Sequence, residues 1–246
     1  MEFFLNYLLK KNNQTKKDKL DDDIKKLYKI KSIICSIYIC YFIRLTNEEN
    51  RGKFDAELQN ILLKISNIYC EEKEKDEKSD ANLFSKIKYQ RLAIEFREKN
   101  FQKFSDLLKI EEEFLLNQIE LDKGIGKNQL LKENLFLLFL AIVTKIPLII
   151  VGKPGTGKSL SSQLIYNSMR GPYSKPNSFF KNYQKINQTY FQGSDFTTPE
   201  DVEDLFKKTK ELYKNNKSEI YMILFDELGL AEKSPSNPLK VLHSKL

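Results

Sequence analysis

Residues Gly152 to Ser159 constrain the fold of this chain more than any other segment. They read GKPGTGKS and contain three of the nine glycines among 246 residues. Glycine allows backbone conformations in which successive N–H groups point at one anion, and the spacing G-x-x-x-x-G-K-[ST] is that of a phosphate-binding loop. In such a loop the lysine carries charge to the outer phosphates and the serine hydroxyl binds Mg²⁺. The motif therefore predicts a nucleotide site.

The flanking residues match the strand–loop–helix order that this motif requires. Ile146 to Val151 is apolar and rich in β-branched residues, which predicts a buried strand. Behind the loop, apolar residues recur at helical spacing until Gly171-Pro172, where the helix should stop. A helix start adds free N–H groups and a positive dipole end to a phosphate site. This context disfavours the alternative, a chance glycine turn.

The rest of the second half alternates strands with helices. Residues 185–192 and 220–225 are predicted strands, and Thr198-Pro199 has the hydroxyl cap and first-position proline of a helix start. A helix over about residues 128–144 is apolar nearly all round, which predicts that it is buried. The fold class is therefore α/β, with a parallel sheet covered by helices.

The strand at 220–225 delivers two acids, Asp226 and Glu227, at its carboxyl end. Ligands of open parallel sheets lie at that end of the strands, and phosphoryl transfer to water needs a held metal and an oriented water. We assign Asp226, together with Ser159, to Mg²⁺, and Glu227, together with Lys158, to catalysis. The alternative is that the two acids simply end a strand in solvent.

The first half is predicted to be an all-helical region over residues 1–120, followed by a domain over 121–246. Its apolar residues form helical stripes. Two of these stripes are Leu27, Ile30, Ile34, Ile37, Tyr38 and Tyr41, and Leu58, Leu62, Ile65 and Tyr69.

Composition excludes several classes of protein. The net charge of +7 is spread over both halves, which argues against nucleic acid as a partner. Three cysteines and one histidine form neither a zinc site nor a disulfide framework, so a reduced, cytoplasmic location is expected. The apolar runs at 32–43 and 135–151 are too short or too interrupted to cross a membrane.

The segments GKPGTGKS and IYMILFDE together resemble those of AAA+ ATPases. The longer stretches TYFQGSDFTTPEDVEDLF and FDELGLAEKSPSNPLKVLHSKL are similar to the mysterin family of giant RING-finger AAA+ E3 ubiquitin ligases. The similarity covers about residues 105–246, with a weaker likeness near residues 40–54. It implies a three-layer αβα P-loop AAA+ domain that uses ATP and Mg²⁺. Residues 1–120 would then be helices between modules or the lid of a preceding module, and the partners would be neighbouring AAA+ modules of one giant chain.

The resemblance also implies roles for individual residues. Lys158 and Ser159 match the family's nucleotide loop, and Asp226 and Glu227 match its metal and water acids. Ile125 lies where AAA+ modules often pack the adenine ring. The loop departs from the family in having glycine directly before the lysine, a change toward the general AAA+ pattern. The expected nucleotide contacts are Ile125, Gly152, Pro154, Gly155, Thr156, Gly157, Lys158, Ser159 and Leu160.

The family's sheet implies five strands in the spatial order five, one, four, three, two. Residues 147–151, 185–192 and 220–225 would be strands one to three. Strands four and five, the sensor, the arginine finger and the lid are expected beyond Leu246. We therefore expect an empty slot, or a direct pairing, between strands one and three, and no measurable ATP turnover by the isolated chain.

Two other functions stay open. The first is a nucleotide-bound structural module that never hydrolyses ATP. The second is a piece of a dynein- or midasin-type tandem AAA+ motor, which shares the same core. Ubiquitin transfer is expected to lie elsewhere, because this sequence holds no RING cysteine set.

Overall fold

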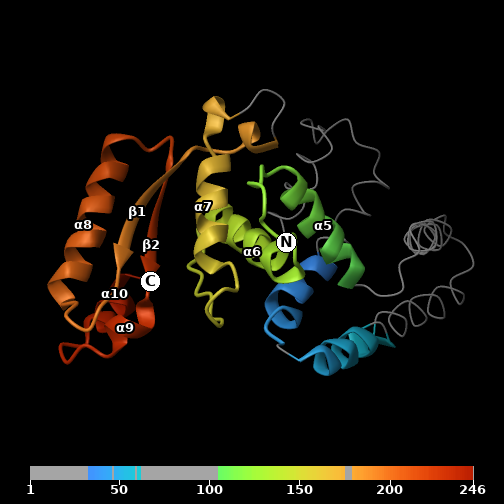
Figure 1. Ribbon diagram of the computed structural model, residues 1–246. Helices are drawn as coiled ribbons and strands as arrows, with labels where there is room; N and C mark the ends of the chain where they lie inside the picture. The colour runs from blue at the N-terminus through green and yellow to red at the C-terminus, as the bar shows by residue number, and fades with distance from the viewer. Residues whose placement is uncertain (1–32, 46, 59, 62–104, 175–178, 246) are drawn as a thin grey trace, which may run out of the picture. The chain divides into compact units, whose positions relative to one another are not determined.

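The computed structural model describes residues 33–45, 47–58, 60–61, 105–174 and 179–245 (Figure 1). The chain divides into two compact units, residues 1–113 and 114–246. The stripe residues Leu27, Ile30, Leu62, Ile65 and Tyr69 lie outside the described residues. In the described part of the chain, no helix has the length and apolar character needed to cross a membrane.

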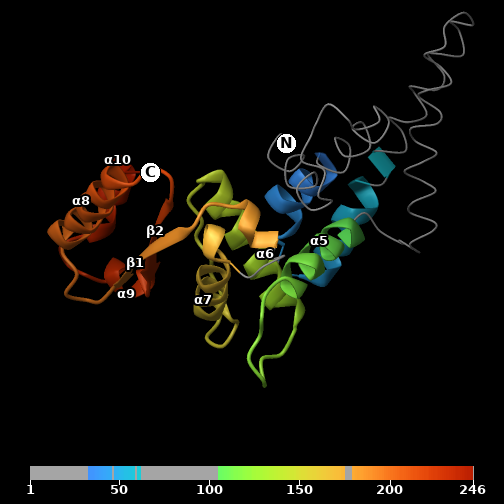
Figure 2. The same cartoon turned by 90° about the horizontal axis from the view of Figure 1, so that it is seen from above.

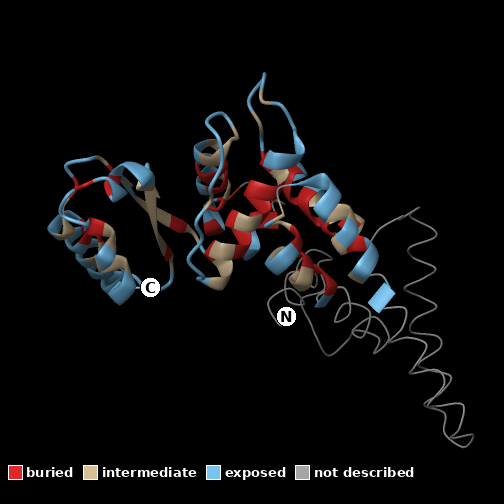
Figure 3. Ribbon diagram, turned by 90° about the horizontal axis from the view of Figure 1, so that it is seen from below, coloured by how far each residue is buried: buried red, intermediate tan, exposed pale blue. Residues whose placement is uncertain are grey.

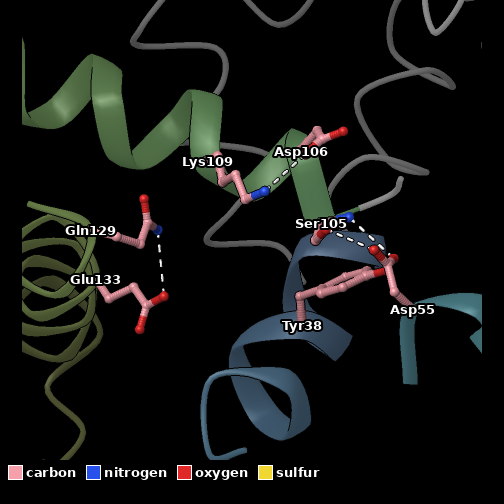
Figure 4. A network of polar contacts seen from close by, with 7 residues as sticks. All are labelled: Tyr38, Asp55, Ser105, Asp106, Lys109, Gln129 and Glu133. Atoms are coloured by element: carbon pink, nitrogen blue, oxygen red, sulfur yellow. Dashed lines mark hydrogen bonds and ion pairs between the residues drawn. The ribbon is translucent and has the colours of Figure 1, made fainter. Parts of the chain in front are cut away.

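The first unit has a helical core tied together by a buried carboxylate. A helix over residues 33–37 continues into the π-helix η2 (Tyr38–Phe42), and a second helix covers residues 48–58. Asp55 accepts a hydrogen bond from the Tyr38 hydroxyl and a 2.7 Å bond from the Ser105 hydroxyl, as Figure 4 shows. Ser105 begins α5 (Ser105–Asn117), so Asp55 joins three segments that are distant in sequence.

Two helices form the centre of the second unit. Helix α6 (Gln129–Thr144) is capped by Asn128, whose side chain accepts the Leu131 N–H at 2.8 Å. It packs against α7 (Lys158–Ser168), and its apolar side chains are mostly buried, as predicted (Figure 3). Aromatic rings in edge-on and tilted contact connect α6 to the 3₁₀ helix η4 (Phe179–Asn182). The rings in that cluster are Phe114, Phe139, Phe179, Phe180 and Tyr183.

The predicted stop after α7 is confirmed, and glycine is needed there. Helix α7 ends at Ser168 and a short 3₁₀ turn, η3 (Gly171–Tyr173), follows. Gly171 has φ +59°, and a Cβ atom there would lie 3.0 Å from the backbone nitrogen of Lys185. The chain can therefore double back, and Ile186 N–H donates to the Met169 carbonyl at 3.1 Å.

The sheet has two parallel strands, β1 (Ile186–Gln192) and β2 (Ile220–Asp226). Ile186 pairs with Ile220 and Gln192 with Asp226, so the strands predicted over residues 185–192 and 220–225 are confirmed. Helix α8 (Pro199–Asn215) connects the strands and starts with a full capping box between Thr198 and Asp201.

The side chains of the strands alternate between two faces. Helix α8 packs on one face, where the hydroxyls of Thr209 and Thr189 lie 3.3 Å apart. Helix α7 contacts β1, and Figures 1 and 2 show the strands between α8 and α7. Three short helices follow β2, namely α9 (Leu228–Glu232), η5 (Pro238–Val241) and α10 (Leu242–Lys245).

The predicted strand over Ile146 to Val151 is wrong. These residues have no strand conformation, and Val151 is 90% exposed. The physical reason is pairing: a strand is stable when its N–H and C=O groups bond to a neighbour, and no described strand lies beside this segment. An apolar run shows the tendency to form a strand but not whether a partner strand is available.

The expectation of a slot or a direct pairing between strands one and three is also wrong, because it assumed that strand one forms. In the described part of the chain the sheet contains only β1 and β2. The small parallel sheet with its helices is consistent with an AAA+ module, whereas the five-stranded three-layer order stays a prediction.

Candidate nucleotide-binding site

The glycine loop leads directly into the first turn of α7. Gly155 and Gly157 both have φ +78°, and Gly157 is the N-cap residue of the helix. A Cβ atom at Gly157 would lie 3.4 Å from Cδ1 of Leu131, an ordinary contact. The left-handed backbone, and not lack of space, therefore requires glycine at this position. The loop thus ends at a helix N-terminus, where N–H groups have no helical partner.

Lys158 folds over the loop that precedes it. Its Nζ donates to the carbonyls of Gly152 and Lys153 at 2.7 and 3.0 Å. The Thr156 hydroxyl also donates to the Lys153 carbonyl, at 2.8 Å. These bonds hold the ammonium group against the carbonyls of the loop itself.

Ser159 and Asp226 meet although 67 positions separate them. The Ser159 hydroxyl on the first turn of α7 donates to Oδ2 of Asp226 at 3.3 Å. Asp226 is the last residue of β2, and its Oδ1 accepts the Glu227 N–H at 3.0 Å. The carboxyl end of the strand and the amino end of the helix therefore present two oxygen ligands to one place.

Glu227 has an unusual backbone conformation. Its φ and ψ are 53° and 42°, the left-handed region, and it is exposed at the N-cap of α9. A non-glycine residue there carries about 1 kcal/mol or more of strain, and such strain is common at functional sites. The turn directs the chain sharply away from the strand immediately after the two acids.

Tyr190 is a half-exposed neighbour of the two acids that the sequence did not indicate. It lies on β1, whose last residue, Gln192, pairs with Asp226. Desolvation and the negative charges of Asp226 and Glu227 raise the pKa of Tyr190. The phenol therefore stays protonated at neutral pH.

Two further residues shape the site without having been predicted. Asn134 on α6 donates from Nδ2 to the Thr156 carbonyl of the loop at 3.1 Å. Gly193 follows β1, and a Cβ atom there would lie 2.7 Å from the Glu227 carbonyl oxygen. A polar residue inside the apolar run ENLFLLFL could have pointed to Asn134, because a buried amide needs a partner.

Three further residues, Pro154, Leu160 and Ile125, were predicted to contact the nucleotide. Pro154 is exposed on the loop, and Leu160 is half-buried on α7. Ile125 is half-buried in a turn, where its N–H donates to the Asp122 carbonyl at 3.2 Å. Its proposed contact with adenine stays a prediction.

The donor set fits ATP with Mg²⁺. Mg²⁺ prefers oxygen ligands and is usually held by one or two protein groups together with the phosphates. The hydroxyl of Ser159 and the carboxylate of Asp226 are such groups, already within hydrogen-bonding distance of each other. The left-handed glycines, the helix N-terminus and Lys158 are the groups that would bind the phosphates.

Comparison with known protein families identifies the domain. The model of the RNF213 AAA domain matches residues 124–246, which is half of the chain. The mysterin family named above is the RNF213 family, so the resemblance is confirmed.

Curated relatives agree with this match. The human E3 ubiquitin-protein ligase RNF213 is 30% identical over 80% of the chain. The zebrafish E3 ubiquitin-protein ligase rnf213-beta is 38% identical over 55%, and the mouse RNF213 is 36% identical over 50%. The chain spans only 2–4% of the length of these relatives.

Proposed function

Because the chain belongs to the family of RNF213 AAA domains, we propose that it binds ATP with Mg²⁺ and hydrolyses it as an AAA+ module. The relatives are named as E3 ubiquitin ligases, and the chain would supply an ATPase part of such a protein. Ubiquitin transfer would lie in other parts of such a protein.

The observation that carries the proposal is the contact between Ser159 and Asp226. A glycine turn alone could bind any anion, and a strand ending in acids is common. Their convergence at 3.3 Å joins the phosphate loop to a carboxylate suited to Mg²⁺. When bound, Mg²⁺ would neutralise charge that develops on the phosphates during their transfer.

The protein residues then have separate tasks. The N–H groups of the glycine loop bind the phosphates, and Lys158 adds a positive charge beside them. Glu227, on the strained turn behind Asp226, would accept a hydrogen bond from the attacking water and orient it.

The alternative of a non-hydrolysing nucleotide module differs only in the role of Glu227. Both functions require Lys158 and Ser159 for binding. Only hydrolysis requires a carboxylate to orient the water. The match to the RNF213 model favours this family over the dynein- and midasin-type motors.

The test identifies the nucleotide that stays bound after one round of reaction. The chain is incubated with ATP and Mg²⁺, washed free of unbound nucleotide, denatured, and its nucleotide is separated by chromatography. We expect ADP on the wild-type chain and intact ATP on Glu227→Gln. Lys158→Ala should retain at least tenfold less of either, because each charge-assisted contact is worth about 1.5–3 kcal/mol.

Two outcomes would contradict the proposal. Intact ATP on both the wild type and Glu227→Gln would favour the structural module. Equal retention by the wild type and Lys158→Ala would show that the nucleotide site is wrongly assigned. The expectation that the isolated chain shows no measurable ATP turnover concerns repeated cycles, whereas this readout needs only a single cleavage event.

A further inference from the structure

Asn134 is a buried polar residue in a helix whose other inward side chains are mainly apolar. It is 6% exposed on α6, near the centre of the second unit. Its Nδ2 donates to the Thr156 carbonyl at 3.1 Å, across 22 positions of sequence. The bond therefore attaches the phosphate loop to a helix that does not otherwise belong to the motif.

We propose that Asn134 is a positioning residue of the nucleotide site, which holds the peptide between Thr156 and Gly157 in the orientation needed to bind phosphate. The inference rests on the proposed function, because it concerns the same loop. It adds α6 to the parts of the domain that determine nucleotide affinity.

The geometry of the peptide group explains how the bond from Asn134 orients the N–H of Gly157. In a trans peptide the C=O and the following N–H point in opposite directions. All described peptide bonds are trans, so a Thr156 carbonyl held toward α6 directs the Gly157 N–H away from α6. That N–H is at the N-cap of α7, beside the free donors of the first helical turn.

The contacts within the loop do not fix this orientation relative to the rest of the domain. The Thr156 hydroxyl and the Lys158 ammonium both bond to carbonyls of the loop itself. Asn134 instead bonds the loop to α6. Leu131, one turn earlier on the same helix face, reaches 3.4 Å from the Cβ position of Gly157. The two residues together position the peptide against the helix.

A purely structural role for Asn134 makes a different prediction. A buried amide needs a hydrogen bond wherever it lies, so its loss could weaken the fold without affecting the site specifically. Asn128 provides a matched control, since its side chain also makes one hydrogen bond, at 2.8 Å, to stabilise the same helix. The Asn128 bond ends on the N–H of Leu131 and not on the loop.

The experiment compares Asn134→Ala and Asn128→Ala in the full chain of 246 residues. Two quantities are measured for each: the Kd for a fluorescent ATP analogue with Mg²⁺, and Tm without nucleotide. We expect Asn134→Ala to raise Kd about fivefold to tenfold, the effect of one lost hydrogen bond. Asn128→Ala should lower Tm but leave Kd within about twofold of wild type.

Asn134→Asp covers the case in which the alanine variant does not fold. It keeps the shape of the side chain but places a carboxylate oxygen opposite the Thr156 carbonyl, so Kd should rise at least as much. An unchanged Kd in the folded Asn134 variants, or an equal rise in Asn128→Ala, would overturn the inference. If the wild-type chain itself does not bind the analogue, the proposed function fails instead.

Discussion

The backbone that carries Glu227 lies so close to Gly193 that only glycine fits at this position. It lies behind the two acids of β2, where its N–H donates to the Asp226 carbonyl at 2.9 Å. A Cβ atom there would lie 2.7 Å from the Glu227 carbonyl and 3.0 Å from both Ala231 and Phe225. Any side chain at this position would therefore move the backbone that carries Glu227.

We predict that Gly193→Ala lowers the free energy of unfolding by about 1–3 kcal/mol, the usual cost of overpacking. Gly229→Ala is the matched control, because nothing lies within 4 Å of a Cβ atom at Gly229 on α9. That change should be neutral or stabilising by up to about 1 kcal/mol. Urea unfolding of both variants measures the difference, and an equal effect of the two would contradict the geometry.

At single residues, the sequence predicted positions within a motif and missed positions defined by contacts. Lys158 and Ser159 were predicted from the spacing of the glycine loop, and Asp226 from its place at the carboxyl end of a predicted strand. Asn134 and Tyr190 lie on other elements, and only the folded chain brings them to the site. A single sequence contains no direct signal for such a contact.

The prediction of helices and strands was likewise correct in some segments and wrong in another. The segments 185–192 and 220–225 form strands because each has the other as a neighbour. The more apolar run ending at Val151 does not form a strand, and Ile146, Leu148 and Ile149 are exposed along it. Local composition predicts an element only when a partner is also present to satisfy its backbone.

The buried carboxylate in the first unit links elements in a way that can be tested. Asp55 accepts from Tyr38, which is fully buried, and from the hydroxyl and N–H of Ser105 at the start of α5. No sequence pattern indicated this cluster. It places an acid where it both satisfies two hydroxyl groups and caps a helix.

We predict that Asp55→Ala lowers the free energy of unfolding by about 2–6 kcal/mol, because two buried hydroxyls each lose a partner at about 1–3 kcal/mol. Tyr38→Phe should cost only about 1 kcal/mol, since Asp55 keeps both bonds to Ser105. Chemical denaturation followed by circular dichroism provides both values. A loss no larger in Asp55→Ala than in Tyr38→Phe would show that the carboxylate does not join these segments.

For the molecule as a whole, the second unit contains all the residues of the proposed ATP site. Its described sheet has two strands, and the family match covers residues 124–246. The relatives are far longer than this chain. The central claim is therefore that a nucleotide and Mg²⁺ bind between the start of α7 and the end of β2.

The most direct test is the effect of Mg²⁺ on nucleotide affinity in the wild type and in Asp226→Asn. The amide retains an oxygen that can accept the Glu227 N–H, so the turn is preserved while the charge is lost. We predict that Mg²⁺ lowers the Kd for an ATP analogue at least about tenfold in the wild type and by less than about twofold in Asp226→Asn. An equal effect of Mg²⁺ on both proteins would contradict the metal site formed by Ser159 and Asp226.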